Sequence, residues 1–353
     1  MKLPVYLQEK RNAKLWRELI GQQGRELLDA VCDPAAPQGL CQVPAIESLR
    51  HVGLQNSRRV DDVVRWRSSE DLPPASRYIG SPSDEEAHCS KKRRTQWVGE
   101  KVHRTETGET ELPLLIPHGE TTSAPIPDDA MLPTMHAELD RQALFPPEHL
   151  VDTGDVDAQL LVESQQAYQV DLVGPTRNEY RWPANQQKGF DASHFLIDWD
   201  QHQAICPEGQ TSVRWSPTKD KWQNQVIRMK FSLTECQKCP SRSLWTQSAS
   251  SSRRSLTIRP QAQYQAFMQR RNQETSKEFI QGYAKRAGIE GTISQGIRTM
   301  GLRRSRSLGQ EKTHRQHLAT AAALHLVRGI AWVEGIPRAQ TRRSSFARLS
   351  DGA

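Results

Sequence analysis

Apolar residues recur at spacings of three and four in two segments near the start of the chain, "NAKLWRELIGQQGRELLDAV" and "PAIESLRHVGL". This period is typical of helices with one apolar face. Prolines at positions 34, 37 and 44 separate the two segments. The polar stretch that follows, "RRVDDVVRWRSSEDLPPASR", predicts a linker.

From Trp97 the pattern becomes one of strands. "WVGEKVHRTET" alternates and "LPLLIPHGETT" is a short apolar run, so the two predict a hairpin. A Pro-rich loop, "TTSAPIPDDAMLP", and a short helix, "TMHAELDRQALF", come next. The buried strands "EHLVD" and "VDLVGP" then flank the helical segment "DAQLLVESQQAY". Continuous apolar strands in this order predict a parallel pair within an α/β sheet.

Residues 185–260 break this rhythm with short alternating strands, in "FDASHFLIDWDQHQAICPEG", "TSVRWSPT", "QVIRMKFSL" and "RSLTIRP". They predict a β-rich insertion. From Gln261 the chain turns helical and ends in a basic tail rich in Ser and Arg. The predicted organisation is a helical N-terminal part with a linker (1–75), an α/β core (76–184), the insertion (185–260) and a completion of the core with the tail (261–353).

Composition limits the classes of protein that the chain can belong to. Hydrophobic residues make up 36% of it and the mean hydropathy is −0.72, which predicts a modest core with sizeable loops. No run predicts a membrane span, and "HLATAAALHLVRGIAWV" is more typical of a buried helix. The first residues do not form a signal peptide. Six cysteines in 353 residues do not predict a disulfide framework, so a cytosolic protein is expected.

The charge is distributed unevenly. From Arg253 to the end there are 19 Lys and Arg against 6 Asp and Glu, an excess of 13, while the preceding 252 residues hold 29 basic and 35 acidic residues. A basic C-terminal third combined with a mildly acidic remainder of the chain suggests that the protein binds a polyanion. A solvated basic tail is the alternative, and charge alone does not distinguish the two.

One predicted helix carries candidate chemistry around Glu290. Helical spacing puts a tyrosine, an arginine and a carboxylate on one stripe, namely Tyr283, Arg286, Glu290, Ser294 and Ile297. Glycines at 288, 291 and 296 each weaken a helix by roughly 1 kcal/mol, which suggests close approach by a backbone or ligand. An ordinary surface Arg–Glu pair is the alternative.

Several motifs in order resemble bacterial insertion-sequence transposases of the DDE, RNase H-like superfamily. "YAKRAGIEGTISQGIR" is similar to the Y-x-x-R-x-x-x-E stretch with the family's last acidic residue, and "HLVDTGDVDA" to its middle motif, an apolar strand before D-x-G-Y. "SPSDEEAHCSKKRRTQWVGEKVH" resembles its S-P-x-D-x-x-A…K-K…W-x-G-Y-K segment, and "GLRRSRSLGQEKTHRQHLATAAALHLVR" its closing helix. The likeness runs from about residue 76 to 349.

The resemblance implies an RNase H-like mixed sheet flanked by helices and interrupted by the insertion. It also implies that the protein acts as a homodimer on double-stranded DNA, namely on the element's terminal repeats and on a target. The expected location is the bacterial cytoplasm, at the nucleoid, and no membrane partner is expected. Asp152 and Glu290 would be catalytic ligands of Mg²⁺ or Mn²⁺, because cleavage by two ions about 4 Å apart needs converging carboxylates. Arg286 would lie near a phosphate and Tyr283 would position DNA.

The sequence also departs from the family pattern. The first catalytic aspartate, in an apolar-D-[ST]-T strand, has no counterpart, and the resemblance does not give its role to Asp84, Glu106 or Glu120. Asp155 and Glu100 stand where the family has tyrosines. Asp157 is expected to begin the next helix, where a carboxylate favours the first turn. We therefore expect an N-terminally truncated, impaired transposase. The alternative is a non-catalytic DNA-binding remnant that interferes with intact copies.

Three cysteines of the insertion have metal-ligand spacing. Cys236 and Cys239 form C-x-x-C and Cys206 is a third thiol, while His202 would complete a structural Cys3His zinc site. In the related pattern a fourth cysteine stands where this chain has Trp245, and a metal-free knuckle fits equally well. Cys32, Cys41 and Cys89 are expected to be buried small apolar residues. An interaction module built on the zinc site is a third possible function.

Basic clusters supply candidate phosphate contacts, which give affinity without reading bases. The predicted DNA-binding residues, besides Tyr283 and Arg286, are Lys91, Lys92, Arg93, Arg94, Lys101, Arg298, Arg303 and Arg304. His103, His314 and His317 are expected to be packing or surface residues. A Ser-His-Asp hydrolase is excluded by the lack of a G-x-S-x-G elbow.

Overall fold

The computed structural model describes residues 10–61, 63–92, 94–109, 111–154, 156–176, 190, 192–245 and 253–337. The chain has a mixed α/β fold that divides into two compact units. The first unit comprises Met1–Pro127 and Ile289–Ala353, and the second is the continuous segment Asp128–Gly288. Over the described residues, no helix is both long and apolar enough to cross a membrane.

The first unit begins with the two predicted helices, α1 (Lys10–Val31) and α2 (Pro44–Asn56). The expected linker is wrong in part, because β1 (Ser57–Val60) and β2 (Val63–Trp66) pair there as an antiparallel hairpin. Asp61 provides the left-handed turn residue between them, with φ 48°. The hairpin forms because Val64 packs against α1, where its Cγ1 would lie 3.0 Å from a Cβ added to Gly21.

The cysteines of this region are also different from the expectation. Cys32 and Cys41 form a disulfide that joins the end of α1 to the 3-10 helix η2 (Leu40–Gln42). Cys32 is exposed, and the free Cys89 is only partly buried, so none of the three is a core residue. Arg50 Nη2 lies 3.3 Å from Cys32 Sγ and 3.1 Å from Cys41 Sγ.

A four-stranded antiparallel sheet follows in the order β3-β4-β5-β6. Its strands are β3 (Ile79–Ser81), β4 (Asp84–Lys92), β5 (Thr95–Thr105) and β6 (His118–Ser123). The predicted pairing of the region after Trp97 is present, but its second strand is later than expected, since Leu112–Ile116 precede β6. The strand β4 was not predicted, because its polar sequence DEEAHCSKK has no apolar alternation.

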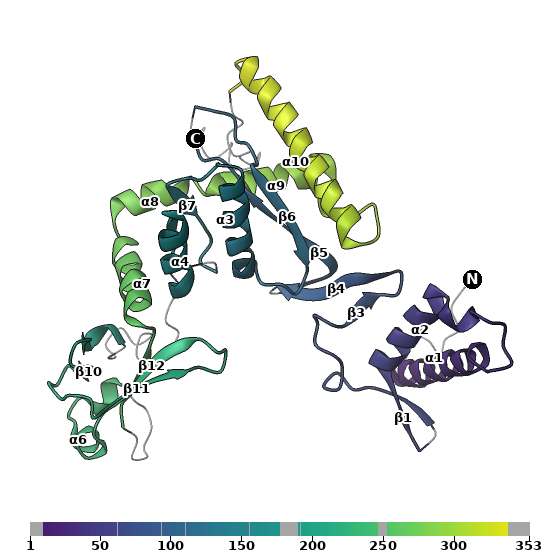
Figure 1. The fold of residues 1–353 in the computed structure, drawn as a ribbon, viewed down its shortest axis with the longest axis horizontal. Coiled ribbons are helices and arrows are strands. Elements are labelled where there is room, and N and C mark those ends of the chain that lie inside the picture. The colour runs from purple at the N-terminus through teal and green to yellow at the C-terminus, as the bar shows by residue number, and fades with distance from the viewer. Residues whose placement is uncertain are drawn as a thin grey trace, which may run out of the picture. The chain divides into compact units, whose positions relative to one another are not determined.

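The last helix, α10 (Gln310–Val333), lies along β6 and β5 (Figure 1). Leu324 is fully buried and packs with Ala321 and Ile116. Two carboxylates of β4 accept backbone N–H groups at the start of this helix: Asp84 from Gly309 and Glu86 from Gln310. The expected buried helix is thus buried on one side only, since Leu326, Ile330 and Val333 are more than half exposed.

The second unit contains the predicted parallel pair. Strands β7 (Glu148–Leu150) and β8 (Asp171–Val173) run parallel, and α4 (Ala158–Tyr168) joins them. Asp157 begins α4 as predicted, with its carboxylate accepting from Gln159 N at 2.8 Å. The helices α3 (Leu132–Arg141), preceded by the 3-10 helix η3 (Asp128–Met131), and α7 (Gln261–Gln273) complete this part. Its core consists of Leu132, Val151, Val156, Leu161 and Leu172.

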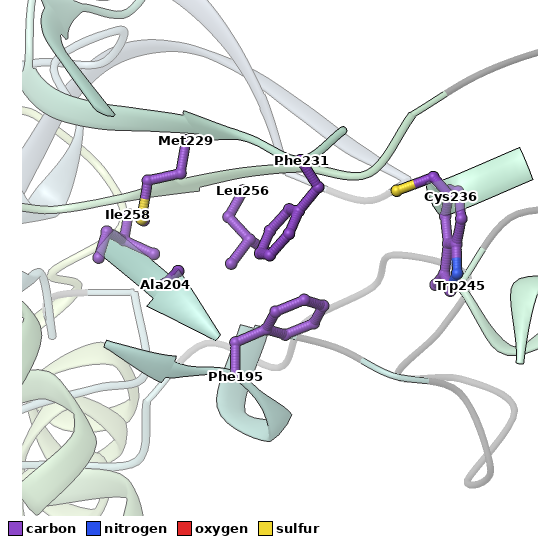
Figure 2. Packing of buried hydrophobic residues seen from close by; sticks show 8 residues of the cluster. All are labelled: Phe195, Ala204, Met229, Phe231, Cys236, Trp245, Leu256 and Ile258. Carbon is purple, nitrogen blue, oxygen red and sulfur yellow. The ribbon is translucent and has the colours of Figure 1, made fainter. Parts of the chain in front are cut away.

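Short strands lie in each of the predicted segments between residues 190 and 260. One pair is β9 (Leu196–Asp198) with β10 (Gln203–Ile205), and a three-stranded sheet has the order β11-β12-β13, formed by Arg214–Lys219, Gln225–Lys230 and Ser255–Ile258. The short helices are η4 (Ala192–His194), α6 (Leu233–Lys238) and η5 (Arg242–Leu244). Figure 2 shows the core that these elements share, in which the rings of Phe195 and Phe231 lie next to each other at a tilt of 54°.

Candidate functional site

Asp152 lies directly after the end of β7. The backbone continues the ladder by one bond, because Val151 N donates to Val173 O at 2.8 Å. The side chain of Asp152 is 58% exposed, and its Oδ1 accepts from Thr153 N at 2.9 Å. A rigid strand therefore ends in a carboxylate that faces solvent, and oxygen donors of this type suit hard divalent cations.

Two residues of the predicted Glu290 motif meet this strand end. Tyr283, in α8 (Lys277–Ala284), donates from Oη to Val151 O at 3.1 Å across 132 residues of sequence. Arg286 Nη2 lies 3.6 Å from Asp152 Oδ2. The structure thus brings together parts of the two motifs that the resemblance assigned to one site. The arginine also provides a positive charge next to the carboxylate.

The single helical stripe through Tyr283, Arg286 and Glu290 is wrong. The helix α8 ends at Ala284, Arg286 lies in a turn, and α9 (Ala287–Met300) begins after it. The turn is closed by short-range bonds, from Arg286 N to Tyr283 O and from Gly288 N to Lys285 O. Of the glycines that suggested close approach, a Cβ added to Gly296 would lie 3.2 Å from Leu302 Cδ2, whereas one added to Gly291 would meet open space.

Gly174 lies so close to the backbone at the end of β7 that a side chain does not fit there. A Cβ there would lie 2.6 Å from Val151 O and 2.8 Å from Val156 Cγ2. We expect Gly174→Ala to lower the free energy of unfolding by about 1–3 kcal/mol, because the added methyl displaces the strand that carries Asp152. Urea unfolding measures this loss. Gly154→Ala is the control, since its position is open, and equal losses in both variants would contradict the explanation.

Glu290 lies in the first turn of α9, where it is exposed. The helix is held on its other side by Thr292, which is 1% exposed. Thr292 Oγ1 donates to Glu106, and Arg328 Nη1 contacts Glu106 Oε1 at 2.6 Å. This buried network fixes the orientation of the helix that carries Glu290. Sequence analysis missed it because its members come from three distant segments.

The other acids near the predicted motifs have structural partners. Glu106 is held by Arg328, Asp84 caps α10, and Glu120 accepts from Thr121 N at 3.0 Å. Glu100 is partly buried, and burial together with Asp84 raises the pKa of its carboxyl. Asp155 lies outside the described residues.

Most of the predicted DNA-binding residues are exposed in the first unit. They are Lys91 and Lys92 at the end of β4, Arg94 in the following turn, Arg298 in α9, and Arg303 and Arg304 before α10. Lys101 donates to Ile126 O at 2.7 Å. Arg93 lies outside the described residues. As predicted, the histidines serve packing: His103 and His317 are buried, and His317 Nδ1 bonds to Thr121 Oγ1 at 2.8 Å.

The three thiols of the insertion line one cavity of about 210 Å³. Cys206, Cys236 and Cys239 share its wall with Trp245, which lies beside Cys236 (Figure 2). Among the described residues, no group of three or more His, Cys, Asp or Glu side chains is arranged to hold a metal ion. His202 is not among the described residues lining the cavity, and its ring packs 5.5 Å from that of Trp215. The zinc site therefore stays a prediction.

A pair of histidines lies beneath the Asp152 strand. His149, in β7, has its Nδ1 3.0 Å from Nε2 of His136, which is 2% exposed. Burial lowers the pKa of both rings, and His136 contributes to lowering the pKa of His149 to about 4. Ser164 Oγ lies 3.4 Å from the other nitrogen of His136. The neutral pair is therefore the form that the fold stabilises.

This pair predicts acid sensitivity. The folded-state pKa of His149 lies below its ordinary value of 6.5, so the unfolded chain binds more protons, and stability falls as the pH drops from about 6.5 toward 4. Between pH 7.5 and 5 we expect a loss of about 2 kcal/mol in the free energy of unfolding from His149. Urea unfolding at both pH values measures it. His149→Gln should remove most of the dependence, and an unchanged slope would assign it to other groups.

Comparison with protein families identifies the domain. Residues 205–329 match the model of the transposase DDE domain family. The match supports a DDE-type transposase. The matched range includes Tyr283, Arg286, Glu290 and the three thiols, whereas Asp152 precedes it. No curated protein and no solved structure matches the chain.

Proposed function

We propose that this transposase binds the ends of an insertion sequence, and that Asp152 and Glu290 are its ligands for Mg²⁺ or Mn²⁺ in DNA strand cleavage and transfer. The contact between Tyr283 and the Asp152 strand carries the proposal, because it joins the matched DDE segment to a carboxylate outside it. Both acids are exposed carboxylates, which suits the chemistry of these ions. When bound, the ions would activate the attacking oxygen and stabilise the leaving oxygen.

The protein's own residues contribute positioning and charge. Tyr283 holds the backbone at Val151, so the carboxylate of Asp152 projects from a fixed point. Arg286 is 22% exposed beside Asp152, where a guanidinium suits a phosphate oxygen. The exposed cations of the first unit supply further phosphate contacts, which position DNA without reading its sequence. Association as a homodimer on DNA and a location at the bacterial nucleoid belong to the same proposal.

Salt dependence tests the DNA interface. We expect the affinity for duplex DNA to fall linearly with log[salt], and the triple variant Lys91→Ala, Lys92→Ala, Arg94→Ala to reduce the slope by about 3, one for each phosphate that the protein then leaves unneutralised. Fluorescence anisotropy with a labelled duplex measures both values. Replacing Arg141, Lys219 and Lys221 by alanine removes the same charge from the second unit and serves as the control. Equal slopes for the two triple variants would place the interface elsewhere.

The catalytic part of the proposal is tested by nicking. We propose that cleavage is weak, since the sequence has no counterpart of the family's first aspartate. A supercoiled plasmid with the element's terminal repeats and Mg²⁺ is the substrate, and we expect binding with little or no nicking. If the wild type nicks the plasmid robustly and Asp152→Ala does not, the claim of impaired cleavage is wrong, while the claim that the protein is an enzyme stands.

The second candidate function is a non-catalytic DNA-binding protein that interferes with intact copies. Exposed cations such as Lys91, Lys92 and Arg94 support it, because phosphate contacts do not require the two acids. It predicts that Glu290→Ala binds DNA as tightly as the wild type and still inhibits an intact relative in mixed assays. Failure of every form to bind DNA would reject both functions.

A further inference from the structure

The disulfide between Cys32 and Cys41 closes a short loop between the first two helices. Cys32 follows α1 directly, where its backbone N–H still donates to Leu28 O at 3.0 Å, and Cys41 lies in η2, just before α2. The two cysteines are nine residues apart in sequence. The helices α1 and α2 also contact each other (Figure 1), so the disulfide is not the only link between these segments.

A guanidinium group lies against both sulfur atoms of this disulfide. Arg50, in α2, places its Nη2 3.3 Å from Cys32 Sγ and 3.1 Å from Cys41 Sγ. Its Nη1 pairs with Glu47, about one helical turn earlier, and this ion pair orients the guanidinium. A disulfide sulfur is a weak acceptor that gains little from a cation, whereas a thiolate gains a charge-assisted hydrogen bond. The guanidinium therefore stabilises the opened form of the bond more than the intact one.

Two of the free thiols have neutral donors instead. Cys89 Sγ accepts from the side-chain amide of Gln96 at 3.0 Å, and Cys206 Sγ accepts from the backbone N–H of Gln210 at 3.3 Å. A neutral N–H group stabilises a thiolate less than a guanidinium does. The direct contact with Arg50 therefore distinguishes the disulfide from these two thiols.

The two sulfurs of the disulfide differ in access and in their electrostatic surroundings. Cys32 is exposed and Cys41 is partly buried, so a small molecule in solution reaches Cys32 more easily. Cys32 also lies at the C-terminal end of α1, whose partial negative charge disfavours a thiolate there. Cys41 Sγ has the shorter contact with Arg50. An incoming nucleophile should therefore attack Cys32 Sγ, with Cys41 Sγ as the leaving atom.

We propose that the Cys32–Cys41 disulfide is an exchange site for small thiols, in which Arg50 stabilises the leaving thiolate of Cys41. In the first step a thiolate bonds to Cys32 Sγ, and the electron pair of the broken S–S bond leaves with Cys41. In the second step another thiolate attacks the small-molecule sulfur on Cys32 and releases a small disulfide and the thiolate of Cys32. Two small thiols are oxidised, the protein disulfide is reduced, and the two protons pass to the cysteines.

The order of attack is tested by trapping the mixed disulfide in the full chain. No DNA is present, so the result is independent of the proposed function. The free thiols are first capped with N-ethylmaleimide, glutathione is added, and iodoacetamide then stops the reaction and caps each thiol that was released. Peptide mass spectrometry should find glutathione on Cys32 and the acetamide group on Cys41. Glutathione on Cys41, or maleimide on both cysteines before glutathione is added, would overturn the proposal.

The role of Arg50 is tested by the rate of reduction. Arg50→Gln should slow the reaction with glutathione roughly tenfold, because the rate depends on how well the leaving thiolate is stabilised. Arg50→Lys keeps a cation at this position and should retain most of the wild-type rate. The rate is measured as the appearance of iodoacetamide-labelled Cys41 over time at constant pH.

A matched control removes a positive charge from α1 instead. Arg25 pairs with Asp29 at 2.9 Å, and Arg25→Gln should change the rate by no more than about twofold, because solvent and salt screen exposed charges. Equal rates in Arg50→Gln and Arg25→Gln would overturn the role of Arg50. Circular dichroism identifies a variant that fails to fold, and the trapping experiment on the wild type decides the proposal in that case.

Discussion

Replacing Glu106 with alanine is expected to lower the free energy of unfolding by about 3–5 kcal/mol, the cost of leaving a buried charge without its partner. The Glu106 side chain is 5% exposed and contacts Arg328, which is 15% exposed. Arg104 depends on the same carboxylate: burial and Arg328 lower the pKa of its guanidinium, and Glu106 counteracts them. Without Glu106, two cations are buried beside each other.

Urea unfolding of Glu106→Ala and of a surface control measures this effect. The control is Glu311→Ala, because Glu311 pairs with Arg315 where both side chains are more than 70% exposed; a change within about 1 kcal/mol is expected. Glu106→Gln keeps an acceptor for Thr292, so its loss in the free energy of unfolding should lie between those of Glu106→Ala and Glu311→Ala. A loss in Glu106→Ala no larger than in the control would show that water or another group compensates the arginines.

The second large effect is expected for Phe231→Ala, with a loss of about 3–5 kcal/mol in the unfolding of the second unit. The ring is 1% exposed at the centre of the cluster in Figure 2, 5.6 Å from that of Phe195, and it lines the thiol cavity. Truncation enlarges a cavity that the surrounding strands cannot fill, since they are fixed by their ladders.

Thermal unfolding followed by tryptophan fluorescence measures this loss, because Trp245 belongs to the same cluster. Leu196→Ala is the control: it removes an apolar side chain of the same unit that is 71% exposed, and its cost should stay within about 0.5 kcal/mol. If the two variants lose similar stability, the cluster around Phe231 does not stabilise the second unit.

Local periodicity predicted the elements whose apolar residues recur at a regular spacing. The helices α1, α2 and α4 and the parallel strands at Leu150 and Leu172 follow from it. It did not predict β4, whose sequence is polar and which is held by pairing with β5. It also did not predict the β1–β2 hairpin, whose strands are only four residues long and are held by their pairing and by the contact of β2 with α1. Pairing partners distant in sequence leave no local signal, so the register of these strands was not accessible.

The candidate site was predictable to a similar degree. Motif order led to Asp152 and Tyr283, and the structure shows their strand and helix in contact. The break after Ala284 was not predicted, because Lys285 and Arg286 are ordinary helix formers and the turn is closed by backbone bonds. The Cys32–Cys41 disulfide was missed as well, since spacing alone does not distinguish paired cysteines from packed ones.

The capping of α10 by Asp84 and Glu86 has a consequence for synthesis on the ribosome. These bonds join residues more than 220 positions apart, so the first unit is completed only when the last helix has emerged. The second unit is one continuous segment and can fold while the chain is still growing. Until then, Asp84 and Glu86 of β4 have not yet received the N–H groups of Gly309 and Gln310, and the side of β6 that α10 contacts is uncovered. Ribosome stalling at a point where the second unit has left the exit tunnel and α10 has not should therefore yield a protease-resistant second unit and a still cleavable first one.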